Sequence, residues 1–236
     1  MAKVFIGVGH GGKDSGAVGY LVEKEVNLVE ALACRDFLEV HGVQVLMSRT
    51  SDEDDSLNDE IRECNAFSPD LAISVHNNAG GGDGFECFYH YKGGTSKTLA
   101  ENIEAEVKAI GQNSRGCKIR LNSSGTDYYG FIRETACPAV IVEGCFIDNE
   151  ADVQIADSLE EQKAFGVAYA KGILKTLGIS IKENQAQLTP SSNAKYYVQV
   201  GAYAQKENAE KQLQKAKDAG FSDAFMRVVA QTNSRT

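Results

Sequence analysis

Four polar side chains stand at the ends of strand-like runs or at a helix start, in segments that lie far apart in the sequence. His10 follows the apolar run VFIGVG, and His76 closes the run LAISVH. Glu143 closes the run AVIVE, and Glu23 lies where the first long helical pattern begins. In parallel α/β sheets the carboxyl ends of the strands meet at one edge, where ligand sites form. The pattern therefore predicts that these four residues converge on one site.

Two histidines and a glutamate are typical ligands of a catalytic zinc ion, which keeps three protein ligands and one open position. Zinc lowers the pKa of a water in that position to about 7, and an uncoordinated glutamate can take up the proton of that water. A single histidine at the end of an apolar strand is more often structural than a ligand. The metal hypothesis therefore depends on all four residues together.

The glycine-rich stretch GVGHGGKDSGAVG, residues 7–19, has a second interpretation as a phosphate-binding loop. Gly7, Gly9 and Gly12 match a dinucleotide-binding loop only formally, because residues 13–19 prolong the loop where that motif needs a helix. No Gly-Lys-Ser/Thr follows, as a Walker A motif would require. The metal interpretation is favoured.

Apolar periodicity predicts alternating strands and helices. Short apolar runs predict strands over residues 3–8, 43–47, 71–75, 84–91 and 139–142. Helical spacing predicts helices over residues 26–38, 57–67, 99–110 and 158–177, with capping patterns that begin at Ser56 and Ser158. This order is typical of an α/β domain with a mostly parallel mixed sheet flanked by helices, and we expect it to span residues 1–179.

The remainder of the chain divides into two parts. Residues 180–194 are polar, contain Pro190-Ser-Ser, and predict a linker. Residues 195–236 predict a strand, an amphipathic helix that ends at Gly220, and a second strand. So short a segment buries too little apolar surface for a core of its own. We expect it to be part of a module or to need a partner.

Composition excludes several classes of function. The net charge of −9 without a basic stripe argues against a nucleic-acid partner. No apolar run reaches the length of a membrane span, and Met1-Ala2-Lys3 leads directly into a strand, which predicts no cleavable signal peptide. The six cysteines are widely spaced and contain no C-x-x-C, so we expect them to be reduced and mostly buried.

Several motifs carry a resemblance to one enzyme family. They are GHGGKDSGAVG, EKEVNL at 23–28, SRT at 48–50, DLAISVHNNA at 70–79 and PAVIVEGCFIDN at 138–149. In this order and spacing the chain resembles, over about residues 3–178, the zinc-dependent N-acetylmuramoyl-L-alanine amidases of the amidase-3 family. The resemblance implies their phosphorylase/hydrolase-like α/β fold.

The resemblance implies a role for each candidate site residue. His10, Glu23 and His76 are the implied ligands of one Zn²⁺ ion, and Glu143 is the implied catalytic carboxylate. Glu25 competes with Glu23 on residue type, and the family register selects Glu23, four places before Asn27. Asn78 falls in a motif position near the substrate.

The implied activity is that of a peptidoglycan hydrolase, which cuts the amide bond between N-acetylmuramic acid and the L-alanine of the stem peptide and so lyses the cell wall. Two alternatives stay open: a zinc peptidase that acts within the stem peptide, and a non-catalytic wall-binding protein on an amidase fold.

The C-terminal segment is similar to half of a SPOR domain through YYVQVGAYAQKENAEKQLQKAKDAGF. That resemblance implies binding to glycan strands, and the half-size unit also suggests a homodimer formed through it. Without a signal peptide, we expect the chain to be made in the cytoplasm. It would then reach the wall through a phage holin, as an endolysin does, or after lysis of a sporulating cell, as an autolysin does.

Overall fold

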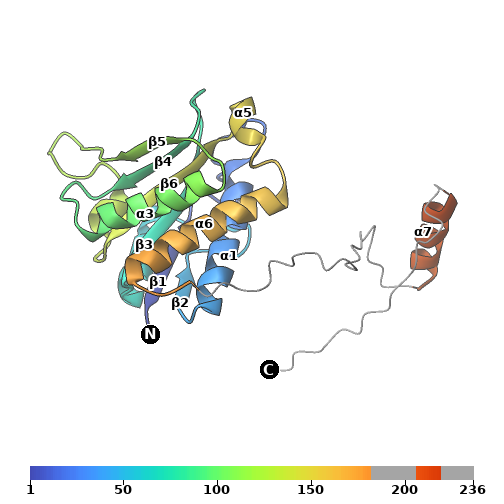
Figure 1. Cartoon of the computed structure of the whole chain (residues 1–236), viewed down its shortest axis with the longest axis horizontal. Helices are drawn as coiled ribbons and strands as arrows, with labels where there is room; N and C mark the ends of the chain where they lie inside the picture. Colours follow the sequence, from blue (N-terminus) through green and yellow to red (C-terminus); the bar gives the residue numbers. More distant parts are fainter. Residues whose placement is uncertain (182–205, 219–236) are drawn as a thin grey trace. The chain divides into compact units, whose positions relative to one another are not determined.

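The chain divides into two units, Met1–Glu183 and Asn184–Thr236, and the computed structural model describes residues 1–181 and 206–218. The first unit holds the sheet and most of the helices (Figure 1). Its strands are β1 (Lys3–Val8), β2 (Gln44–Met47), β3 (Leu71–Asn78), β4 (Phe85–Tyr89), β5 (Ser114–Lys118) and β6 (Ala139–Phe146). Its helices are α1 (Glu23–Val40), α2 (Leu57–Phe67), α3 (Thr95–Ala109), α4 (Gly130–Glu134), α5 (Glu150–Val153) and α6 (Leu159–Leu177).

The six strands form one sheet in the order β2-β1-β3-β6-β4-β5. Neighbouring strands are parallel except β4, which runs antiparallel to β6. The prediction of a mostly parallel mixed sheet flanked by helices is therefore confirmed. Since β1, β3 and β6 run in the same direction, their carboxyl ends share one edge of the sheet.

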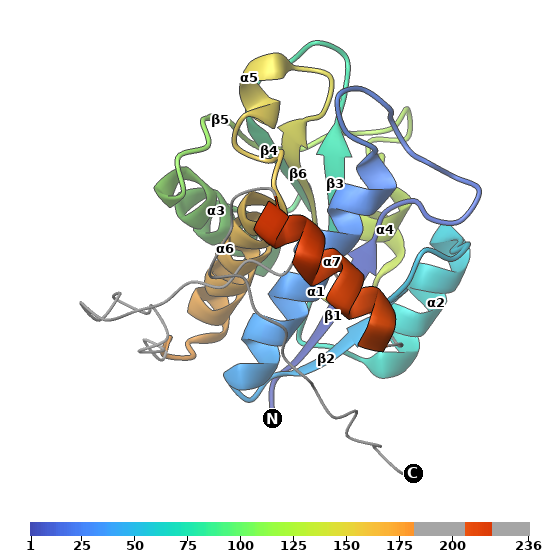
Figure 2. The same cartoon turned by 90° about the vertical axis from the view of Figure 1, so that its right-hand side faces the viewer.

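Helices cover both faces of the sheet. Helices α1, α3 and α6 pack together over one face, where the larger apolar core lies (Figure 1). Helices α2 and α4 lie on the other face, over a smaller core that includes Phe5, Ile61, Phe131 and Ile141 (Figure 2). Strands buried on both faces need apolar side chains in succession, which is why the sequence of these strands shows continuous apolar runs.

Helix boundaries follow the capping patterns of the sequence. The Ser56 hydroxyl accepts a hydrogen bond from the backbone N–H of Asp59 at the start of α2. Ser158 and Glu161 form a complete capping box at the start of α6, and Gly178 ends that helix in the left-handed conformation. Both predicted helix starts are confirmed, because side-chain oxygens here satisfy N–H groups that have no partner within the helix.

Three short elements were absent from the sequence prediction. Strand β5 has the sequence SRGCK, which lacks an apolar alternation because it lies at the edge of the sheet. Helices α4 and α5 have five and four residues, too few to show helical periodicity. The predicted helix over 99–110 begins earlier, at Thr95, because its first turn is polar.

In the second unit the structure describes α7 (Lys206–Asp218), which agrees with the predicted amphipathic helix. The two strands predicted in this unit, and the predicted linker from residue 182 onward, lie outside the described residues. The homodimer expected through this unit stays a prediction.

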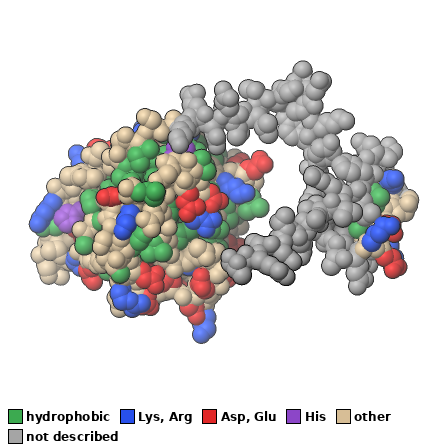
Figure 3. All heavy atoms as spheres, turned by 90° about the horizontal axis from the view of Figure 1, so that it is seen from below, with side chains coloured by type: hydrophobic (Ala, Val, Ile, Leu, Met, Phe, Trp, Pro, Cys, Tyr) green, Lys and Arg blue, Asp and Glu red, His purple; other side chains and the backbone are tan. Residues whose placement is uncertain are grey.

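One face of the first unit is mixed in charge. Figure 3 shows Lys, Arg, Asp and Glu side chains interspersed between apolar groups on one of its faces. Among the described residues, no helix combines the length and the apolar character needed to cross a membrane.

Candidate metal centre and active site

Strands β1 and β3 deliver the two candidate histidines to the same edge of the sheet. They are parallel, with Val8 in register with Val75, so the end of β1 lies beside His76, while β3 itself continues to Asn78. His10 lies two residues beyond β1 and has a φ of 61°, a left-handed conformation that turns the chain into the glycine-rich loop. The rings of His10 and His76 lie edge to face with centroids 5.1 Å apart.

Glu23, the first residue of α1, lies between the two histidines. Its Oε1 is 3.2 Å from Nε2 of His10 and 3.1 Å from Nδ1 of His76. One ligand atom from each of the three residues lies within 4.8 Å of the others. In residues 1–181 and 206–218 this is the one cluster of three or more His, Cys, Asp or Glu side chains with such geometry. Two imidazole nitrogens and a carboxylate oxygen fit a catalytic zinc ion.

The Glu23 carboxylate is buried, with 6% of its side chain exposed, yet it stays ionised. Burial acts to raise its pKa, but hydrogen bonds from His10 and His76 outweigh burial, so the net shift is downward. The backbone N–H groups of Ala17 and Asn77 also donate to it, at 2.8 and 3.2 Å. In turn, the hydrogen bond to Glu23 is the main cause that raises the pKa of His10 to about 9. The site thus holds a negative charge aimed at a point that a cation can occupy.

Asp14 fixes the orientation of the His10 ring. Its Oδ2 lies 2.8 Å from Nδ1 of His10, and its Oδ1 accepts the backbone N–H of Gly16 at 3.0 Å. This contact leaves Nε2 of His10 to face Glu23. A carboxylate behind a histidine ligand sets its tautomer and raises its basicity. Asp14 lies within the GHGGKDSG motif, but its residue type and position alone do not indicate this role.

Two glycines of the loop leave room for the candidate metal ligands. A Cβ at Gly9 would lie 2.2 Å from the His76 ring. At Gly16, where φ is +63°, a Cβ would lie 2.6 Å from both Oε2 of Glu23 and the His10 ring. Here the glycine-rich stretch brings the backbone against the candidate metal ligands.

Arg49 holds the same loop in place through hydrogen bonds to backbone carbonyls. It is only 2% exposed, and its guanidinium donates to the carbonyls of Val8, Gly9, Lys24 and Ser51 at 2.8–3.2 Å. These hydrogen bonds join the end of β1 to the first turn of α1. In the sequence, Arg49 stands out only as part of the SRT motif.

The acidic run after Arg49 also holds the loop. The carboxylates of Asp52 and Asp54 accept the backbone N–H groups of Gly12 and Lys13, each at 2.8 Å. Lys24 of α1 then bridges Asp52 and the Gly12 carbonyl, both at 2.8 Å.

Glu143 lies beside His76 on the same face of the sheet. The two residues are in register on β6 and β3, and side chains that are paired in this way point to the same face. Burial raises the pKa of Glu143 to about 7. A carboxyl with a pKa near neutrality can both accept and release a proton during turnover.

Asn78 and Cys145 lie next to these residues in the sequence but make other contacts. Asn78 donates from Nδ2 to Oε2 of Glu86 at 3.2 Å, so it braces a second carboxylate on this face. Cys145 is fully buried and its thiol lies 3.2 Å from Oδ1 of Asn77. Burial raises the pKa of Cys145, which makes it a poor nucleophile and confirms the expectation of a small buried residue.

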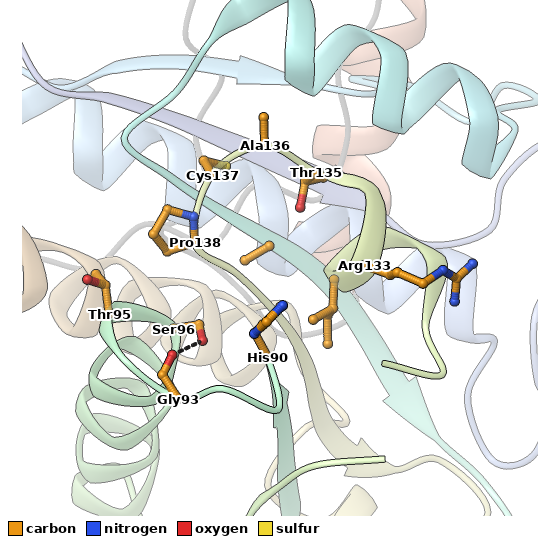
Figure 4. A pocket seen from close by; sticks show the side chains of 11 residues that line it. His90, Gly93, Thr95, Ser96, Arg133, Thr135, Ala136, Cys137 and Pro138 are labelled. Atoms are coloured by element: carbon orange, nitrogen blue, oxygen red, sulfur yellow. Dashed lines mark hydrogen bonds between the residues drawn. The ribbon is translucent and has the colours of Figure 1, made fainter. Parts of the chain in front are cut away.

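A surface pocket lies at the opposite edge of the sheet. It is lined by residues that include His90, Ser96, Arg133 and the segment from Thr135 to Ala139 (Figure 4). Its residues lie where β4 ends and β6 begins, and Nε2 of His90 is paired with Asp127 at 3.2 Å. His90 is therefore separate from the cluster of His10, Glu23 and His76.

Comparison with known proteins gives two family matches. Residues 4–175 match the N-acetylmuramoyl-L-alanine amidase family, and residues 192–236 match the SPOR domain. The chain is 36% identical to the sporulation-specific N-acetylmuramoyl-L-alanine amidase of Bacillus subtilis (strain 168), over 96% of this chain and 85% of that protein. It is also 36% identical to the endolysin of Bacillus phage SPP1, over 77% of this chain and 69% of that protein.

The fold agrees with solved structures. The catalytic domain of CwlV, an N-acetylmuramoyl-L-alanine amidase from Bacillus (Paenibacillus) polymyxa, superposes with a TM-score of 0.69 at 28% identity. The match covers 76% of this chain and all of that domain.

Proposed function

Because this chain belongs to the N-acetylmuramoyl-L-alanine amidase family, we propose that it is a zinc-dependent enzyme with His10, Glu23 and His76 as the ligands of one ion and Glu143 as the catalytic carboxylate. Its substrate is peptidoglycan, and the bond cleaved joins N-acetylmuramic acid to the L-alanine of the stem peptide. The observation that carries the proposal is the cluster of three ligand atoms within 4.8 Å, with Glu143 in register beside His76.

A bound zinc ion would supply Lewis-acid chemistry at the amide carbonyl and lower the pKa of water to about 7. The protein contributes the proton transfers. Glu143, with its pKa near 7, takes a proton from the attacking water and passes it to the nitrogen of the leaving alanine. Asp14 holds His10 through Nδ1, and the loop anchored by Arg49 keeps His10 and Glu23 in place.

We assign the second unit, with its SPOR match, to attachment to the cell wall. The similarity to the sporulation-specific amidase extends over 96% of the chain and so includes both units, whereas the similarity to the phage endolysin covers 77%. This difference favours action on the wall of a sporulating cell over release through a holin.

Digestion of purified peptidoglycan by the zinc-loaded chain tests the activity. We expect mass spectrometry to find released peptides with a free N-terminal alanine and glycan strands with intact muramic acid. New termini inside the stem peptide would identify a peptidase instead. An unchanged wall, under zinc-replete conditions, would identify a non-catalytic wall-binding protein.

A further inference from the structure

A row of charged residues crosses the sheet next to the proposed active site. Glu143 on β6 is in register with His76 on one side and with Glu86 of β4 on the other. Residues that are directly opposite in a sheet have neighbouring side chains on the same face, about 4.5–5.5 Å apart at Cβ. Glu86 therefore lies beside Glu143, on the side away from the candidate metal ligands.

Two cations of β5 meet at the Glu86 carboxylate. Nε of Arg115 and Nζ of Lys118 both lie 2.5 Å from Oε1 of Glu86, and Asn78 donates to Oε2. The Glu86 side chain is only 8% exposed, whereas Arg115 and Lys118 keep 45% and 35% of their side chains in solvent. The buried glutamate thus fixes the inner ends of two cations whose outer donors face solvent.

Two cations bind one carboxylate here. Arg115, Lys118 and Glu86 together carry one positive charge in excess, with Glu143 as the next carboxylate along the row. Within the described residues, Glu86 is the only hydrogen-bond acceptor for either cation, so both terminal amino groups of the Arg115 guanidinium are unused. The guanidinium also lies 5.3 Å from the centre of the Phe146 ring, which restricts its movement. A fixed guanidinium whose two terminal amino groups are free, beside an ammonium, suits a carboxylate ligand.

The distance between Glu143 and the two cations of β5 matches the reach of the second residue of a stem peptide. Strand β5 is two strands from β6, roughly 10 Å from Glu143 at about 4.8 Å per strand. Two extended residues span about 7 Å, and a side chain adds the remainder. A carboxylate on the second residue of a stem peptide, counted from the scissile bond, can reach the cations.

We infer that Arg115 and Lys118 bind a carboxylate of the stem peptide on the alanine side of the scissile bond, and that Glu86 positions them. This inference rests on the proposed amidase function and adds to it a preference among stem peptides. Substrates whose second residue carries free carboxylates would bind more tightly than those in which the carboxylates are amidated.

Steady-state kinetics with a matched pair of substrates test this subsite. The pair is N-acetylmuramoyl-L-alanyl-D-glutamate and its diamide, with the zinc-loaded full chain as enzyme. We expect a lower KM for the acid, a preference that weakens as salt is added. Arg115→Gln and Lys118→Gln should each raise the KM for the acid about 10-fold, leave its kcat within about twofold, and change the kinetics of the diamide little. Lys118→Arg should restore most of the preference.

Lys97→Gln is the control, because Lys97 is an exposed cation of α3 that pairs only with Glu101 among the described residues. Each single variant leaves one cation on Glu86, and thermal unfolding and zinc content verify that it folds. Equal KM values of the wild-type chain for acid and diamide would overturn the subsite while leaving the amidase function intact. Equal losses on both substrates in the variants would also overturn it. No cleavage of either compound, or of peptidoglycan, would overturn the proposed function itself.

Discussion

The Glu143 carboxyl is the group on which turnover depends most directly. We expect Glu143→Gln to reduce kcat by about 100- to 10,000-fold, because glutamine keeps the shape of the side chain but cannot carry a proton. Zinc content and thermal stability should match the wild-type chain, since Glu143 is not a proposed ligand. Lysis of peptidoglycan at the wild-type rate by this variant would remove Glu143 from the mechanism.

A substitution of Asp14 tests whether its contact with Nδ1 orients His10, a proposed zinc ligand. Asp14→Asn keeps the acceptor for Gly16 N–H but loses the negative charge at Nδ1 of His10. The expected result is a 10- to 100-fold weaker zinc affinity, measured by competition with a chelator. Asp36→Asn is the matched control, because Asp36 is equally exposed and pairs with Arg35 away from the site. Equal zinc affinities of the two variants would contradict the role of Asp14.

The sequence indicates the proposed ligands but not the residues that hold them in place. His10, His76 and Glu143 follow apolar runs, so strand direction alone predicted that they share an edge, and the structure brings them together with Glu23. Asp14 and Arg49 make hydrogen bonds that depend on how the glycine-rich loop folds. A loop has no regular spacing of apolar residues, so the sequence pattern does not predict these contacts.

At the level of elements, helices α1 and α6 are joined by a buried polar contact. Glu30 of α1 is fully buried, accepts the hydroxyl of Tyr169 at Oε2, and has no partner for Oε1 within the described residues. Burial raises the pKa of Glu30 to about 8, above its value of about 4.3 in an unfolded chain. The folded state therefore holds the proton more tightly, and this contribution to stability is lost as pH rises from about 4.3 through 8.

Glu30→Gln tests this coupling between pH and stability. We expect the variant to gain stability relative to the wild-type chain as pH rises from 5 to 8, by on the order of 1 kcal/mol or more, because the amide does not titrate. Urea unfolding of both chains in EDTA at several pH values measures the difference. A stability difference that is constant across this range would show that Glu30 is ionised in the folded state.

Prediction of the elements succeeded where the chain is buried on both faces or capped by side chains. Strands β1, β3 and β6 and helices α2 and α6 have these signals. Strand β5 lacks such signals, because an edge strand needs no apolar side chains where it is exposed. The cations Arg115 and Lys118 lie on this strand, so the proposed substrate subsite could not be predicted without the fold.

At the scale of the whole molecule, the two units should separate catalysis from attachment. A chain truncated after Glu183 contains every described site residue. We expect it to bind zinc and to cleave small soluble muropeptides within about twofold of the full chain. Its binding to insoluble peptidoglycan should fall about 10-fold or more, because a second attachment point raises the effective affinity. Co-sedimentation with purified walls measures this, and undiminished binding would assign attachment to the first unit.

The central claim is that three residues from β1, α1 and β3 hold one zinc ion. Diffraction data from zinc-loaded crystals, collected on both sides of the zinc absorption edge, test it most directly. We expect one anomalous peak at about 2.0–2.2 Å from His10, Glu23 and His76, with Glu143 nearby but not bound. An anomalous map without a peak between these three side chains, or with zinc bound elsewhere, would contradict it.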